Sequence, residues 1–65
     1  MIINNLLETI VPETEIEFQN ANGETIMEWE QGYDIDVLDV SFRYKKIKSL
    51  KIANYKRIEV VVGTD

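Results

Sequence analysis

The sequence predicts an α+β domain: a small antiparallel four-stranded sheet, with elements in the order α-β-β-α-β-β, one face of which is covered by an N-terminal helix and a short second helix. Two patterns predict this arrangement. Apolar residues recur at helical spacing at the start of the chain, whereas two later stretches alternate apolar and polar residues as β-hairpins do. The length of 65 residues fits a single domain, residues 1–65, with a thin core.

The first helix is predicted at residues 2–10. Apolar side chains at positions i, i+3, i+4 and i+7 form one stripe of a helix, and this spacing is met by Ile3, Leu6, Leu7 and Ile10. Pro12 ends the helix, because proline supplies no amide donor and disfavours the helical conformation of the residue before it.

The first hairpin is predicted between residues 14 and 30. Its two arms, residues 14–19 and 24–30, alternate in the manner of strands with one buried face, which would carry Ile16 and Phe18. The arms are joined by Asn20-Ala21-Asn22-Gly23, a turn sequence, because Asn and Gly tolerate the positive φ of tight turns. The opposite face of this hairpin would be strongly acidic.

Two interpretations compete for residues 33–43. Ile35, Leu38 and Phe42 have helical spacing, and Asp34 is a suitable N-cap. The beginning of the stretch also alternates like a strand. We favour the short helix, because a third strand here would leave the first hairpin with little to pack on.

A second hairpin is predicted for residues 45–62, with its turn at Ala53-Asn54. In its first strand Ile47 is out of phase with Leu50 and Ile52, which indicates a bulge or a bend near Lys48-Ser49. The apolar patterns together predict the core: Leu6, Leu7, Ile10, Ile16, Phe18, Met27, Trp29, Leu38, Phe42, Leu50, Ile52, Ile58, Val60 and Val62.

Charge is sorted along the chain. Residues 1–42 contain ten acids and no Lys or Arg, whereas residues 43–65 contain all seven bases and two acids, so the net charge is −5. Such segregation indicates either that the two halves pair internally or that a surface is made for a charged partner.

The residue types argue against catalysis. The chain has no His and no Cys, and neither a phosphate-binding loop nor a dinucleotide fingerprint occurs, so we predict no enzyme, no catalytic residue and no cofactor. Asp34, Asp36 and Asp39 offer oxygen ligands, but the Gly and Glu of an EF-hand loop are missing. Acids beside a helix start are explained more simply by the helix dipole, so no metal site is predicted.

The acids provide the candidate binding surface. Carboxylates in rows can occupy a basic groove that otherwise holds nucleic acid, because the two surfaces are electrostatically complementary. The candidate residues are the hairpin and connector acids Glu13, Glu15, Glu17, Glu24, Glu28, Glu30, Asp34, Asp36 and Asp39. The alternative is that the acidic face serves only to keep the protein in solution, or that its charge is neutralised by the basic second hairpin.

Two other functions stay open. Bases interleaved with Tyr44 and Tyr55 could bind single-stranded nucleic acid, although the negative net charge opposes this. Alternatively, the acidic and basic halves could associate between copies, or an exposed edge strand could pair. The basic face that would bind nucleic acid consists of Arg43, Lys45, Lys46, Lys48, Lys51, Lys56 and Arg57.

The sequence also resembles small early proteins of bacteriophages and prophages. Leu6-Leu7-Glu8-Thr9-Ile10, then Thr14-Glu15-Ile16-Glu17-Phe18 with an Asn-Gly turn, matches their "ELLEII"-like helix and acidic hairpin. Lys46-Ile47-Lys48-Ser49-Leu50 and residues 55–62 match their "EVKSI … IxIxV" close, whereas residues 42–46 depart from their "LLDRE". Several small acidic phage proteins of this kind are anti-defence inhibitors, including anti-CRISPR proteins.

This resemblance implies a non-catalytic inhibitor whose partner is a host protein, a CRISPR effector or another nuclease. It also implies that the protein is located in the cytoplasm of the host cell. The absence of Cys and of a signal-peptide pattern favours an intracellular protein, and the apolar runs are too short to predict a membrane span. The oligomeric state is not predicted.

Overall fold

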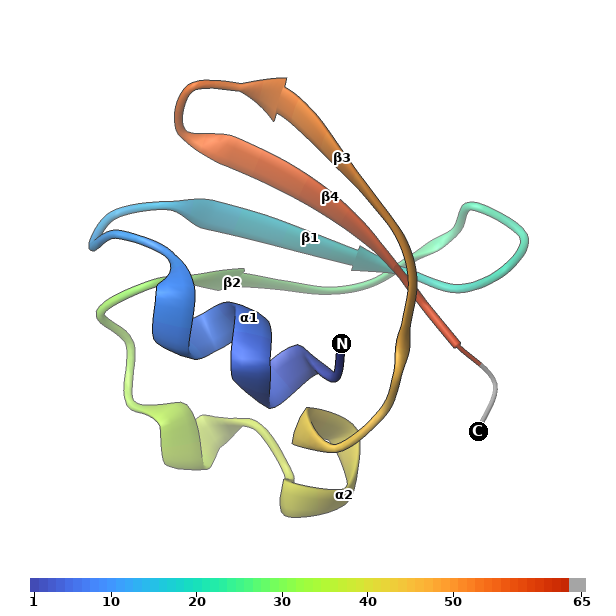
Figure 1. Cartoon of the computed structure of the whole chain (residues 1–65), viewed down its shortest axis with the longest axis horizontal. Helices are drawn as coiled ribbons and strands as arrows, with labels where there is room; N and C mark the ends of the chain where they lie inside the picture. The colour runs from blue at the N-terminus through green and yellow to red at the C-terminus, as the bar shows by residue number, and fades with distance from the viewer. Residues whose placement is uncertain (64–65) are drawn as a thin grey trace.

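Two β-hairpins and two short helices make up the fold, which is shown by a computed structural model that describes residues 1–63 (Figure 1). This confirms the predicted α+β class and the order of elements. None of the helices in this part of the chain is long and apolar enough to cross a membrane. In chain order the elements are α1 (Ile3–Thr9), β1 (Glu15–Gln19), β2 (Thr25–Glu30), the 3-10 helix η1 (Ile35–Val37), α2 (Val40–Arg43), β3 (Ile47–Asn54) and β4 (Arg57–Val62).

The four strands form one sheet in the order β2-β1-β4-β3. Each hairpin is antiparallel, but β1 and β4 are parallel neighbours, with Ile16 beside Ile58 and Phe18 beside Val60. The sheet is therefore mixed rather than wholly antiparallel as predicted. The reason is the connector through η1 and α2, which carries the chain past β1 to the far edge before β3 begins, so that β4 returns to the centre in the direction of β1.

The core lies between the sheet and α1. Ile16, Phe18 and Val60 point from the two central strands into it and are fully buried, as is Ile3 of α1. Phe42 of α2 packs edge-to-face on Phe18, with ring centres 5.0 Å apart, so both helices cover the same face of the sheet. The predicted arrangement of layers is confirmed.

Two residues of the predicted core are exposed. Leu50 is 42% and Ile52 69% accessible, although both alternate as buried strand residues do. They belong to β3 at the edge of the sheet, and the helices lie beneath β1 and β2, at a distance from the β3–β4 turn (Figure 1). The prediction was wrong because alternation reports which face a side chain is on, but not whether anything covers that face.

The predicted helix at residues 33–43 is divided into two pieces. Asp34 caps η1 as expected, because its Oδ1 accepts a hydrogen bond from the Asp36 amide at 3.0 Å. Leu38 then has an extended conformation, with ψ of 122°, and is buried in the core before α2 begins. Burial of this side chain separates the two helical turns.

The predicted turn of the first hairpin is confirmed, whereas that of the second was wrong: β3 extends through Asn54, so the turn lies at Tyr55-Lys56 and not at Ala53-Asn54. Asn20 Oδ1 accepts hydrogen bonds from the amides of Asn22 and Glu24 at 2.9 and 3.0 Å, and Gly23 has φ of 84°. The predicted bulge is also present, as the pairing of β3 with β4 shifts between Ile47 and Ser49. These features follow from residues close together in sequence, which is why the pattern revealed them.

Candidate functional site

The face of the sheet opposite the helices carries four of the nine acids predicted for the binding surface. Alternation along the strands turns the neighbours of the core residues Ile16 and Phe18 to this side. We call it the acidic sheet face, and it consists of Glu15 and Glu17 of β1, Glu28 and Glu30 of β2, Lys51 of β3, and Arg57 and Glu59 of β4.

Glutamates lie directly opposite one another across β1 and β2. Glu15 is paired in register with Glu30, and Glu17 with Glu28. Opposite residues on one sheet face are about 4.5–5.5 Å apart at Cβ, and like charges at this separation destabilise the pairing. The sequence therefore places repulsion at the centre of this hairpin, and a cation is needed beside it.

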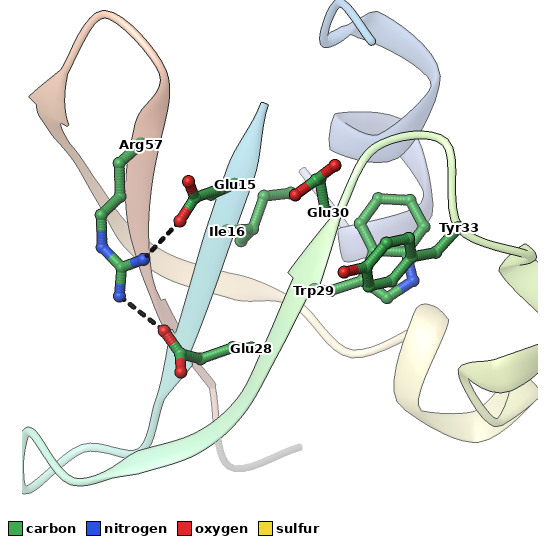
Figure 2. A pocket seen from close by; sticks show the side chains of 7 residues that line it. All are labelled: Glu15, Ile16, Glu28, Trp29, Glu30, Tyr33 and Arg57. Carbon is green, nitrogen blue, oxygen red and sulfur yellow. Dashed lines mark hydrogen bonds and ion pairs between the residues drawn. The ribbon is translucent and has the colours of Figure 1, made fainter. Parts of the chain in front are cut away.

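Arg57 supplies that cation. It begins β4, whose parallel register with β1 places it beside Glu15, and its long side chain reaches on to β2. Nη1 donates to Glu15 at 3.1 Å, and Nη2 donates both to Glu17 and to Glu28, the latter at 2.8 Å. Figure 2 shows the guanidinium between Glu15 and Glu28, while the Glu30 carboxylate points away from it. One arginine thus joins three carboxylates.

Three side-chain donors hold Glu17 in its carboxylate form. Its Oε2 accepts hydrogen bonds from the Thr25 hydroxyl at 2.7 Å and from the Gln19 amide at 2.8 Å, while Oε1 faces Arg57. These donors, with Thr25 the largest contributor, lower the pKa of Glu17 to about 2. The same carboxylates raise the pKa of Arg57, with Glu28 the larger contributor and Glu17 the next. Glu17 and Arg57 are therefore both ionised at neutral pH.

Arg57 does not neutralise the face. The five carboxylates and two cations of the acidic sheet face leave a formal charge of −3. The Glu15 and Glu28 side chains are 51% and 64% exposed despite their ion pairs, whereas that of Glu17 is only 17% exposed. Glu17 therefore supports the cluster from within, and the other carboxylates present negative charge to solvent.

A shallow hollow of about 160 Å³ opens beside this cluster. Trp29 and Tyr33 form one wall, with their rings edge-to-face at 6.3 Å. The indole Nε1 of Trp29 is buried and, within residues 1–63, has no hydrogen-bond partner. The residues that line the hollow are Glu15, Ile16, Glu28, Trp29, Glu30, Tyr33 and Arg57 (Figure 2). Its rim of carboxylates and aromatic rings suits a cationic side chain.

The remaining predicted acids are elsewhere. Glu13 precedes β1, where it adopts the left-handed conformation with φ of 71°. Glu24 lies at the hairpin turn and accepts a hydrogen bond from Asn20. Asp34, Asp36 and Asp39 belong to the connector around η1 and α2, on the helix side of the molecule (Figure 1). The structure separates these connector acids from the acidic sheet face.

The predicted basic residues are divided among different surroundings. Arg57 belongs to the acidic sheet face, and the Arg43 Nε donates to the Leu38 carbonyl oxygen at 3.1 Å. Lys56 lies in the β3–β4 turn with its Nζ 5.6 Å from the Tyr55 ring centre. Of the others, Lys45 and Lys46 precede the edge strand β3, and Lys48 and Lys51 lie within it. In residues 1–63 every ion pair involves Arg57.

The sequence pattern grouped Arg57 with the basic face, whereas in the structure its side chain lies among the glutamates of the first hairpin. It predicted a basic hairpin and an acidic hairpin, but it could not show that β1 and β4 are adjacent. It also missed Tyr33 as a wall of the hollow. The available signal was that Arg57 starts an alternating strand, which places it on the side opposite Ile58 and the core.

The arrangement can bind cations by charge and hydrogen bonding. Within the described part of the chain, no set of three or more His, Cys, Asp or Glu side chains is placed to hold a metal ion. Three carboxylates of the sheet face instead bind the Arg57 guanidinium.

Comparison with protein families assigns this chain to one of them. Neither the curated proteins nor the solved structures contain a match to this chain. A family described as "Protein of unknown function (DUF1125)" matches residues 1–63, which is nearly the whole sequence. The chain therefore belongs to the DUF1125 family.

Proposed function

We propose that this protein is a non-catalytic binding protein whose acidic sheet face docks on a basic surface of another protein. The observation that carries the proposal is the pairing of Glu15 with Glu30 and of Glu17 with Glu28 around a single arginine. A fold that needed these positions only for solubility could mix charges here and avoid the cross-strand repulsion.

Arg57 makes this face rigid without removing its charge. Its three hydrogen bonds fix the carboxylates of Glu15, Glu17 and Glu28 in the unbound protein. Side chains that are already ordered lose less conformational entropy on binding, so this arrangement favours affinity for a partner of matching charge. Glu30 has no ion pair within residues 1–63 and is available to such a partner.

A nucleic-acid-binding protein is the kind of partner that fits. Along each strand, alternate carboxylates are about 6.6 Å apart, and across strands they are closer, so the face is a dense two-row array of negative charge. Grooves that hold DNA or RNA are lined with Lys and Arg to meet phosphates. The same groove would accept these carboxylates, and nucleic acid would compete with the protein for it.

The resemblance to small phage proteins supports a more specific proposal. The partner would be a host defence protein, either a CRISPR effector or another nuclease, and occupation of its nucleic-acid site would inhibit it in the host cytoplasm. We assign the contact to the acidic sheet face alone, since the connector acids Asp34, Asp36 and Asp39 lie on the other side of the sheet.

Affinity capture from a bacterial host lysate tests this assignment. Three baits are compared: the wild type, the face variant E15Q/E28Q/E30Q, and the matched control E8Q/D36N/D39N. Both variants remove three carboxylates while they keep side-chain shape and hydrogen-bonding capacity, and Glu17 is untouched because it supports the cluster. Retained proteins are identified by mass spectrometry, and bound material is then challenged with duplex DNA.

The proposal expects the wild type and the control to retain the same basic nucleic-acid-binding protein, which the face variant loses and duplex DNA displaces. Retention of the same proteins by all three baits would overturn the assignment to this face. Loss with the control but not with the face variant would move the contact to the connector. Retention that duplex DNA leaves unchanged would overturn the choice of a nucleic-acid site.

A further inference from the structure

The two edges of the sheet carry opposite charge. Edge strands leave a row of backbone N–H and C=O groups unpaired, and proteins commonly place charged side chains there to prevent association. In residues 1–63, β2 pairs with β1 alone and β3 pairs with β4 and, at its start, with the N-terminus. Charges of one sign on each edge therefore disfavour pairing between two like edges and favour pairing between the two different edges.

The β3 edge is basic and apolar. Lys46 precedes this strand, and Lys48 and Lys51 lie within it. Leu50 and Ile52 of the same strand expose apolar surface on the side of the sheet that the helices leave uncovered here (Figure 1). The edge already accepts an extended segment at its beginning: the Ile47 amide donates to the Met1 carbonyl oxygen at 2.9 Å, and Ile2 bridges Lys46. The remainder, residues 48–54, is about 23 Å long at 3.3 Å per residue.

The β2 edge is acidic and also has apolar surface beside it. Glu24 precedes the strand, while Glu28 and Glu30 lie along it. Ile26 in the strand and Tyr33 just after it are both more than half exposed. Each edge thus combines unpaired backbone groups with one sign of charge and exposed apolar side chains.

From this complementarity we infer that β3 is the docking edge for a second copy of this chain, which adds its β2 strand and continues the sheet. Contacts between two β3 edges would oppose lysines, and contacts between two β2 edges would oppose glutamates, so both symmetric pairings are disfavoured. The β2–β3 pairing places opposite charges together and brings apolar residues of both copies to the junction. The contact is head-to-tail, so it forms chains rather than a closed dimer.

This assembly is independent of the proposed function. Edge pairing leaves the acidic sheet face of each copy open to solvent, because it uses the sides of the sheet and not its faces. Self-association needs no partner protein, so it is measured on the purified full chain alone.

Sedimentation equilibrium tests the inference on the wild type and on two charge-reversed variants, K48E/K51E for the β3 edge and E24K/E30K for the β2 edge. None of the four substituted side chains has an ion pair within residues 1–63. Each variant has two edges of the same sign and should be a monomer, whereas an equal mixture restores opposite edges. The single variants K51E and K56E form a matched pair, since Lys56 carries the same charge in the turn.

The expected result for the wild type at low salt is a weight-average mass that rises with concentration to at least about twice that of the monomer and falls when salt is added. The mixture of charge-reversed variants should recover this mass, and K56E should retain it while K51E reduces it. A wild type that is monomeric at every concentration would overturn the inference. So would association that persists in both variants, that the mixture fails to restore, or that K56E disrupts as strongly as K51E.

Discussion

Arg57 and Glu17 show how one side chain can make an unfavourable arrangement stable. The guanidinium lies among Glu15, Glu17 and Glu28, and it converts cross-strand repulsion into a connected set of hydrogen bonds. Glu17 is the least exposed of the three and has two further donors, Thr25 and Gln19. The pKa of Glu17 is therefore the property that reports whether the cluster forms in solution.

The shift of that pKa predicts a pH dependence of stability. The carboxyl has an ordinary pKa of 4.5, and the fold lowers it to about 2, so the folded state binds fewer protons than the unfolded state between these values. Stability from Glu17 is therefore complete above about pH 4.5 and is lost as the pH falls toward about 2. Urea unfolding across this range should show a steeper loss for the wild type than for E17Q.

The exposed variant E24Q is the control for this measurement, because Glu24 lies at the hairpin turn away from Arg57. It should lose stability on acidification as steeply as the wild type. If E17Q followed the same curve as the wild type, Glu17 would not be held in its ionised form by the fold.

Glu13 gives a second prediction at the residue scale. Its φ of 71° lies in the left-handed region, where a side chain costs about 1–2 kcal/mol and glycine fits without strain. Relief of this strain stabilises E13G, and the greater loss of backbone entropy by glycine on folding offsets part of the gain. E13G should therefore raise the free energy of unfolding by a net amount of about 0.5–1 kcal/mol in urea titrations. The charge control E13Q should show no such gain, and equal stability of the two variants would mean that Glu13 is unstrained.

Among the helices, strands and turns, the sequence pattern predicted those features that depend on interactions between residues close together in the chain. The stripe ending at Ile10, the Asn-Gly turn and the bulge after Ile47 each depend on residues near one another in sequence, and all three are present. The division of the 33–43 stretch was not predicted, because the burial of Leu38 between two helical turns depends on the position of the sheet.

The contrast between Leu38 and Ile52 tests this distinction. Leu38 lies in a loop yet is buried, so L38A should lower the free energy of unfolding by about 2–5 kcal/mol. Ile52 lies in a regular strand yet is 69% exposed, so I52A should change it by less than about 0.5 kcal/mol. Denaturant titrations measure both values. A comparable cost for the two substitutions would contradict the exposed position of β3.

At the scale of the whole molecule, the parallel contact between β1 and β4 decides what the sorted charge becomes. The sequence predicted two oppositely charged hairpins but not which strands meet, because alternation carries no information on strand order. Through that contact the Arg57 side chain lies among the acids of the first hairpin, while the lysines lie in β3 at the opposite edge or next to that strand in the sequence. The separation of charge is thus partly neutralised at one point and preserved over the rest of the sheet.

The preserved charge is the basis of the proposed partner binding. The most direct test of that proposal is the affinity for the basic protein that the wild type retains in the capture experiment. Calorimetry at fixed salt would compare the wild type with E15Q/E28Q/E30Q and with the control E8Q/D36N/D39N. The acidic sheet face predicts at least about a 10-fold weaker Kd for the first variant and a change within about 2-fold for the control. Equal affinities of the two variants would contradict the assignment of binding to this face.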